Sequence, residues 1–176
     1  MKIRLKSNQK FYLIDPGFFQ KKMRYVFQSL LAVLSLFLVL LVGGTIAHGA
    51  VIAGIASTTA LIFFAPLSYA SSSRRIIGGH ILGVAVAGVS FLIFSIFFPV
   101  TTTAPNVMIY LYCSISLGVL ITLMGILNCE HAPAAGCLLG LNLQGLALDT
   151  ILFIIISAFV LASLRILLIK WIRNLI

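Results

Sequence analysis

Two long runs without a charged residue constrain the fold of this chain more than any other feature. No Lys, Arg, Asp or Glu occurs from Val26 to Ser73, or from Ile76 to Cys129. About 20 apolar residues are enough for one helix to cross the hydrocarbon of a bilayer, so each run must fold back on itself. We therefore predict an all-α polytopic membrane protein.

The overall composition excludes the alternatives. Of the 176 residues, 61% are hydrophobic and 9% are charged, whereas a soluble domain carries about 25% charged residues. This excludes a soluble globular domain and a disordered chain. The three cysteines, an odd number in or beside apolar segments, do not suggest a disulfide framework. The first apolar run begins too late and is too long for the core of a cleavable signal peptide.

The 12 Lys and Arg residues form three clusters that flank the apolar runs. Seven precede the first run, Arg74 and Arg75 separate the two runs, and three lie near the C-terminus. We interpret them as topology signals and contacts with anionic lipid headgroups, rather than as a nucleic-acid surface. Residues 1–25 form a basic segment that is either interfacial or a solvated tail, and residues 26–176 form a single transmembrane domain.

Breaks rich in Gly, Pro, Ser and Thr divide the apolar sequence into six segments. We place them at residues 26–47, 49–70, 76–98, 107–128, 131–147 and 149–170. The second and fifth are the weakest, and the fifth is either a full crossing or a re-entrant half-helix. Only six crossings put all three cation clusters on one side of the membrane, which predicts cytoplasmic termini, in a bacterial inner membrane. Two halves of three segments would form an inverted repeat.

Small residues recur at helical spacing on two of the segments. The third segment carries Gly79, Gly83 and Ala87, and the fifth carries Ala132, Gly136 and Gly140. Such stripes let helices approach closely in lipid, where no hydrophobic force drives their association. We expect helix packing from Gly79, Gly83, Ala87 and Gly140, with a narrow substrate path as the alternative.

Polar side chains in the apolar segments are the candidates for a substrate path. Asn142 and Gln144 are costly there unless they bond to a neighbouring helix or face water and substrate. The histidines His48, His80 and His131 lie at segment ends; an imidazole can donate hydrogen bonds to a small anion and titrates near neutral pH.

The start of the fifth segment suggests an anion site at a helix N-terminus. Pro133 suits the first turn of a helix, where its missing N–H costs little. We expect the N–H groups of Ala134, Ala135 and Gly136 to be free to face an anion. The second and fifth segments would meet near the midplane of the membrane to form this site.

Enzymatic and metal chemistry find no support in the sequence. The metal-capable residues Cys129, Glu130, His131 and Cys137 match no standard zinc spacing. No paired carboxylates, nucleophile elbow or phosphate loop is present, so neither an enzyme nor a cofactor is expected. Asp149 and Arg165 lie too far apart on one helix to pair, and Arg165 is expected to extend to the inner interface.

From residue 53 onward the pattern resembles the HPP family of small integral membrane proteins. The segment from Ala53 to Pro66 is similar to the Gly/Ala/Ser-rich stretch of that family that ends in Ala-Pro, and Arg74-Arg-Ile-Ile-Gly-Gly-His80 is similar to its Arg-Asn-hydrophobic-Ile-Gly-Gly-His motif. The segment His131-Ala-Pro-Ala-Ala-Gly136 resembles the naming motif His-Pro-Pro-Ala-Gly-Ala, with Ala132 in place of the first proline.

This resemblance implies a compact helical membrane domain that transports a small inorganic anion, with nitrite as the first candidate because plastid members are associated with nitrite transport. The alternatives are a structural or assembly protein and a passive small-solute channel; a homo-oligomer is an open option. The residues we assign to the substrate path are His80, His131, Pro133, Gly136, Asn142, Gln144, Pro66 and Ser68.

Overall fold

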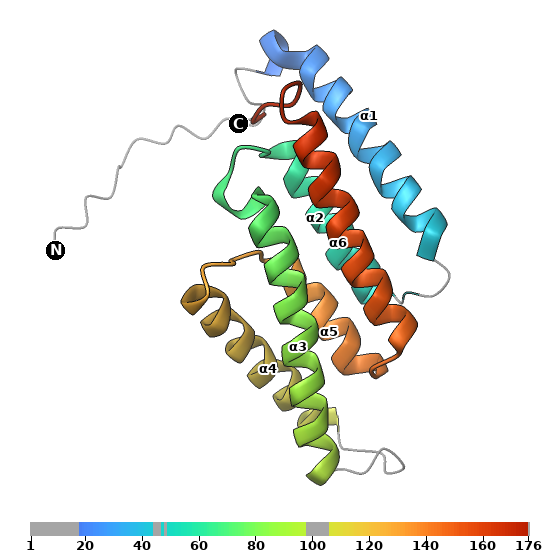
Figure 1. The fold of residues 1–176 in the computed structure, drawn as a ribbon, viewed down its shortest axis with the longest axis vertical. Helices are drawn as coiled ribbons and strands as arrows, with labels where there is room; N and C mark the ends of the chain where they lie inside the picture. The colour runs from blue at the N-terminus through green and yellow to red at the C-terminus, as the bar shows by residue number, and fades with distance from the viewer. Residues whose placement is uncertain (1–17, 44–46, 48, 98–105, 176) are drawn as a thin grey trace, which may run out of the picture.

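A computed structural model describes residues 18–43, 47, 49–97 and 106–175, and within them the chain forms six α-helices (Figure 1). The helices are α1 (Phe18–Gly43), α2 (Gly49–Phe64), α3 (Ser73–Phe97), α4 (Asn106–Ile126), α5 (Ala134–Gln144) and α6 (Leu148–Leu168), with a short 3₁₀ turn, η1 (Tyr69–Ser71), between α2 and α3. The prediction of an all-α polytopic membrane protein is confirmed. Four helices, α1, α3, α4 and α6, are long and apolar enough to cross a membrane.

The two short helices, α2 and α5, make the most extensive contact between any two helices of the bundle. α2 has 16 residues and α5 has 11, and they correspond to the second and fifth predicted segments. Each half of the chain therefore has the order long, short, long. α1 lies on one flank of the bundle and α4 on the other, with α3 and α6 between them (Figure 1).

Close packing of α2 against α5 depends on glycines at their crossing. A Cβ on Gly136 would lie 3.0 Å from Gly54 Cα, and a Cβ on Gly140 would lie 3.0 Å from the backbone nitrogen of Val51. Because these neighbours are backbone atoms, a larger residue cannot be accommodated by rotating a side chain. Glycine is needed here so that the two helix backbones can touch.

An irregular segment, Leu127–Pro133, links α4 to α5. It lies against α3, where a Cβ on Gly79 would be 2.7 Å from the Cβ of His131 and 3.2 Å from the carbonyl oxygen of Cys129. Irregular backbone is tolerated at membrane depth only where protein buries it. Gly79, in the stripe of small residues on α3, lies against this segment and helps to cover it.

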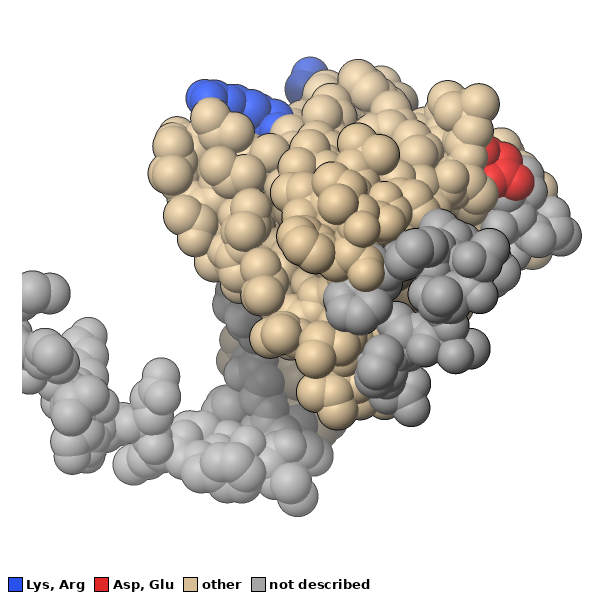
Figure 2. Space-filling view, turned by 90° about the horizontal axis from the view of Figure 1, so that it is seen from below, with Lys and Arg blue, Asp and Glu red and all other residues tan. Residues whose placement is uncertain are grey.

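The basic clusters of the described residues gather at one end of the bundle. Near the start of α1, Tyr25 donates to the carbonyl of Leu175 at 2.9 Å. The turn after α2 reaches the same place, because the N–H of Leu67 donates to the Asn174 side chain at 2.9 Å. The start of α1, the start of α3 and the end of α6 therefore lie at the same end of the bundle (Figure 1). We call this the basic end. Seen from the opposite end, the described part of the molecule presents mostly uncharged residues (Figure 2).

The described helices shift some of the predicted boundaries. α1 begins at Phe18, eight residues before the predicted span at 26, so the last cations of the N-terminal segment lie on the helix itself. α2 ends at Phe64 rather than 70, because Pro66 lacks an N–H and the chain turns there. Residues 1–17 and the predicted loop at residues 99–106 lie outside the described residues, apart from Asn106, the first residue of α4.

Candidate functional site

Two histidines that are far apart in the sequence meet at one threonine inside the bundle. His80 lies on α3, His131 on the irregular segment and Thr58 on α2, and all three are fully buried. The Thr58 hydroxyl oxygen is 3.0 Å from His131 Nε2 and 3.4 Å from His80 Nε2. The imidazole rings are 5.1 Å apart between centroids. We call these three residues the His–Thr–His cluster.

Backbone carbonyls hold both rings in place. His80 Nδ1 lies 2.8 Å from the carbonyl oxygen of Ile76, one turn back on α3. His131 Nδ1 lies 2.9 Å from the carbonyl oxygen of Ala70, in the 3₁₀ turn. A carbonyl only accepts hydrogen bonds, so the Nδ1 atom of each ring carries a hydrogen and donates it. Both Nε2 atoms therefore face the Thr58 hydroxyl.

The cluster lies partway into the bundle from the basic end. Thr58 precedes the end of α2 by six residues, or ~9 Å, and His80 follows the start of α3 by seven, or ~10 Å. The hydrocarbon core is about 30 Å thick, so these side chains lie at a depth where polar groups are rare. Ionisable side chains at such a depth generally mark a functional site.

Arg75, near the start of α3, contacts the irregular segment that carries His131. Its guanidinium lies 3.0 Å from the centroid of the Tyr69 ring, donates to the Asn128 side chain at 2.8 Å, and pairs with Glu130 at 3.5 Å. Charged groups thus flank the irregular segment without entering the cluster.

The expected anion site at the α5 N-terminus is not formed by free N–H groups. The N–H groups of Ala134, Ala135 and Gly136 donate to the carbonyls of His131, Ala132 and Pro133 at 3.0–3.1 Å. That prediction is wrong, because the chain tightens into a 3₁₀-like turn before α5 and satisfies these donors internally. Pro133 does lie directly before the helix, as predicted.

Two other predicted residues, Pro66 and Ser68, lie in the turn after α2 rather than at the cluster. The carbonyl of Pro66 accepts two hydrogen bonds from Arg165, at 2.8 and 3.1 Å. Arg165 was expected to extend to the interface, but it instead ties the end of α6 to this turn. The Ser68 hydroxyl is 2.8 Å from that of Ser71. Both residues shape the turn that carries Ala70 and so help to orient His131.

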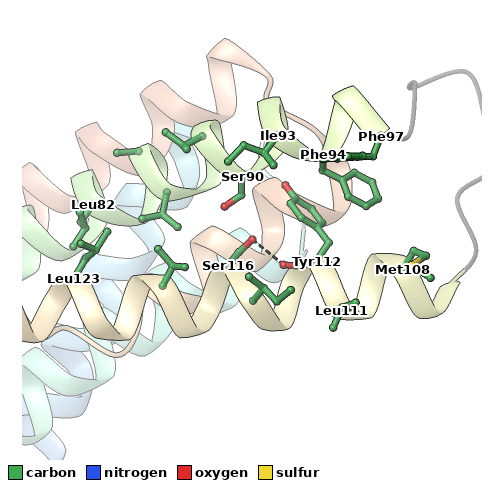
Figure 3. Close-up of a pocket in the computed structure, with 15 residues that line it drawn as sticks. Leu82, Ser90, Ile93, Phe94, Phe97, Met108, Leu111, Tyr112, Ser116 and Leu123 are labelled. Carbon is green, nitrogen blue, oxygen red and sulfur yellow. Dashed lines mark hydrogen bonds between the residues drawn. The ribbon is translucent and has the colours of Figure 1, made fainter.

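Asn142 belongs to a separate polar pair near the opposite end of the bundle. The Tyr112 hydroxyl donates to its Oδ1 at 2.9 Å, and its buried Nδ2 has no hydrogen-bond partner among the described residues. Tyr112 also lines a groove of about 450 Å³ between α3 and α4, where its ring stacks on Phe94 (Figure 3). The groove is lined almost wholly by apolar side chains, which suits an acyl chain better than an anion.

The remaining predicted polar residues do not join the cluster. Gln144 is exposed near the end of α5. His48 lies outside the described residues. Gly136 faces the α2 backbone rather than an open space. Of the eight predicted path residues, only His80 and His131 meet at one point.

Among the buried polar residues that the sequence did not single out, Thr58 and Gln28 make the longest-range contacts. Thr58 is surrounded by small and apolar residues and resembles any helix threonine; only its position one turn after Gly54 hints at a close contact. Gln28 on α1 is also fully buried, and it bonds the backbone of Arg173 through both its oxygen (2.8 Å) and its nitrogen (3.0 Å). Gln28 also donates to the carbonyl of Phe63, so it ties α1 to α2 and the C-terminal segment.

Comparison with known proteins gives one match. The family model described as "HPP, transmembrane region" matches residues 19–176. No curated protein and no solved structure matches the chain. The match covers the described helices from α1 to α6, including all three residues of the His–Thr–His cluster.

Proposed function

Because the chain belongs to the HPP transmembrane family, we propose that it transports a small inorganic anion across the membrane, with nitrite as the first candidate. The observation that supports this function is the His–Thr–His cluster, a fully buried group of polar side chains inside an apolar bundle. A protonated imidazole supplies a positive charge and an N–H donor, both of which a small oxyanion requires. We propose a transporter rather than an enzyme.

The distribution of charge favours an anion over a cation. The basic end carries the described cations and would attract anions, including lipid headgroups, to its surface. The acidic residues of the described part are Glu130, which pairs with Arg75 at 3.5 Å, and Asp149, at the opposite end of α6. In this proposal the basic end faces the cytoplasm of a bacterial cell, and an anion approaching it meets no unpaired carboxylate among those described residues.

Access to the cluster would come from movement of the irregular segment. His131 is held by this segment rather than by a helix, and its only described backbone anchor outside the segment is the carbonyl of Ala70. A local displacement of residues 127–133 would uncover Thr58 and His80 while α2 and α3 stay in place. Irregular backbone beside a buried site is a common feature of transporter binding sites.

A reconstituted flux assay tests the proposal. Purified protein in liposomes should carry nitrite with saturable kinetics, and His131→Ala and Thr58→Val should each lower the rate by about tenfold or more, since each removes a hydrogen-bonding group. Thr59→Val is the matched control. Its hydroxyl is buried on the same helix and also bonds the carbonyl four residues earlier, Ile55, at 3.1 Å, but has no further described partner.

The two alternative functions predict other results. A structural or assembly protein is favoured by the backbone contact between Gly54 and Gly136; it would give no flux of nitrite or of other small anions with well-folded wild-type protein. A passive channel would give flux that does not saturate. Equal rates for Thr58→Val and Thr59→Val would remove the cluster from the transport path.

A further inference from the structure

The His–Thr–His cluster has fewer hydrogens than its acceptors require. Both Nδ1 hydrogens are used by the carbonyls of Ile76 and Ala70. When both rings are neutral, each Nε2 is therefore a bare acceptor. The hydroxyl of Thr58 is the one described donor that faces these two atoms, and it has a single hydrogen.

The distances show which ring lacks a donor. Thr58 Oγ1 is 3.0 Å from His131 Nε2, a normal hydrogen-bond length, but 3.4 Å from His80 Nε2, which is long. The Thr58 hydroxyl also donates to the carbonyl of Gly54 at 3.1 Å, so its one hydrogen is shared among three acceptors, of which that carbonyl already accepts a backbone N–H of α2. With this hydrogen on Gly54 or on His131, the two nearer acceptors, His80 Nε2 faces a lone pair of the hydroxyl oxygen. A buried acceptor without a donor is costly.

We propose that the cluster binds one proton at His80 Nε2, shares it with His131 through the Thr58 hydroxyl, and that this proton accompanies the transported anion. The first two parts concern the protein alone, and the third rests on the proposed function. With the proton on His80, its Nε2–H donates to Thr58, whose O–H donates to His131. Every polar atom of the cluster then has a complementary partner.

The same geometry allows the proton to move between the rings. His80 Nε2 gives its proton to Thr58 Oγ1 while the hydroxyl gives its own to His131 Nε2. The hydroxyl is neutral before and after, and the positive charge passes from α3 to the irregular segment. A second proton is disfavoured because it would place two like charges on rings 5.1 Å apart.

Other titratable groups around the cluster do not replace its rings in this role. On α5, the Cys137 sulfur lies 3.8 Å from the carbonyl of Val51 and faces α2. On the irregular segment, Cys129 and Glu130 lie toward Arg75, at the start of α3. On α6, Arg165 is held by Pro66. Among the described residues, no carboxylate contacts either imidazole ring.

Ring-nitrogen NMR of the purified protein tests proton binding directly. The chain has three histidines, so a His48→Asn background labelled with ¹⁵N-histidine reports only the two rings of interest. At high pH both rings should show the form with hydrogen on Nδ1. On acidification the two rings should respond over one pH interval and take up one proton between them. Thr58→Val should make them titrate separately, whereas Thr59→Val should leave the behaviour unchanged.

Two results would overturn the proton site: rings that stay neutral throughout the pH range in which the protein is folded, or identical titrations with and without the Thr58 hydroxyl. A ring with its hydrogen on Nε2 at high pH would do the same. Each contradicts the hydrogen count on which the inference rests.

Flux measurements test the coupling and keep the two proposals apart. With a pH dye inside the liposomes and the membrane voltage clamped, nitrite entry should carry protons, and its rate should rise by up to about tenfold per unit of falling pH, the limit for one titrating proton. A titrating cluster without any anion flux would refute the proposed function and leave the proton site standing. Anion flux without proton entry would refute the coupling alone.

Discussion

The backbone distances at the crossing of α2 and α5 predict how much a substitution there lowers the free energy of unfolding. We expect Gly136→Ala to destabilise the protein. The added Cβ would lie 3.0 Å from Gly54 Cα, 3.2 Å from Gly54 N and 3.4 Å from the carbonyl oxygen of Ala50. All three are backbone atoms, so relief requires the helices to separate by a few tenths of an ångström along their whole contact.

Two opposing contributions set the change in unfolding free energy, overpacking and the helix preference of alanine. Overpacking of a tight interior by one methyl group costs about 1–3 kcal/mol. Replacing a helix glycine by alanine returns up to about 1 kcal/mol, because alanine loses less backbone entropy. Subtracting the full gain of alanine leaves a net loss of unfolding free energy of up to about 2 kcal/mol for Gly136→Ala. Gly88→Ala on α3 is the matched control, since a Cβ there meets nothing within 4 Å.

The assay is unfolding of the purified protein in mixed micelles by increasing amounts of a denaturing detergent, followed by helix content. Gly136→Ala should unfold at a lower detergent fraction than the wild type, and Gly88→Ala at the same or a higher one. If the two alanine variants unfold together, the α2–α5 contact is looser than described. Gly136 would then be free to line a path, as its sequence context also allowed.

Two further predictions concern the α3 stripe and the topology. Gly83→Leu should lower the melting temperature by several degrees more than Gly88→Leu, because a Cβ at Gly83 would lie 3.2 Å from the carbonyl oxygen of Ala134; equal melting temperatures would show that the stripe faces lipid. Single cysteines introduced at Leu67 and Trp171, in a background without the native cysteines, should react with an impermeant maleimide from one side of the membrane and a cysteine at Gln144 from the other. Labelling of Gln144 from the same side as Leu67, with Trp171 on the opposite side, would make α5 a re-entrant half-helix.

The sequence by itself determined the class of protein and the outline of its path. The uncharged runs from Val26 to Ser73 and from Ile76 to Cys129 are apolar enough to lie in lipid. A bilayer offers no hydrogen-bond partners for backbone N–H and C=O groups, so these runs must form helices, which pair those groups internally. The three cation clusters predicted that the start of the first segment, the start of the third and the end of the sixth would lie on one side of the membrane. In the structure, the start of α3 and the end of α6 do lie close together. Glycine spacing likewise suggested a packing face on α3, and a Cβ at Gly79 or Gly83 would lie within 3.2 Å of a neighbouring segment.

Only the tertiary structure decided where the polar groups meet. His80 and His131 are 51 positions apart, and Thr58 precedes His80 by 22, so no local pattern shows that the three share one point. Their meeting depends on how deeply the irregular segment enters beside Gly79, which is a matter of backbone packing between distant segments. The N–H groups after Pro133 were mispredicted for a related reason. The first N–H groups of a helix are free only if no nearby carbonyl accepts from them, and the path of the irregular segment places such carbonyls within reach.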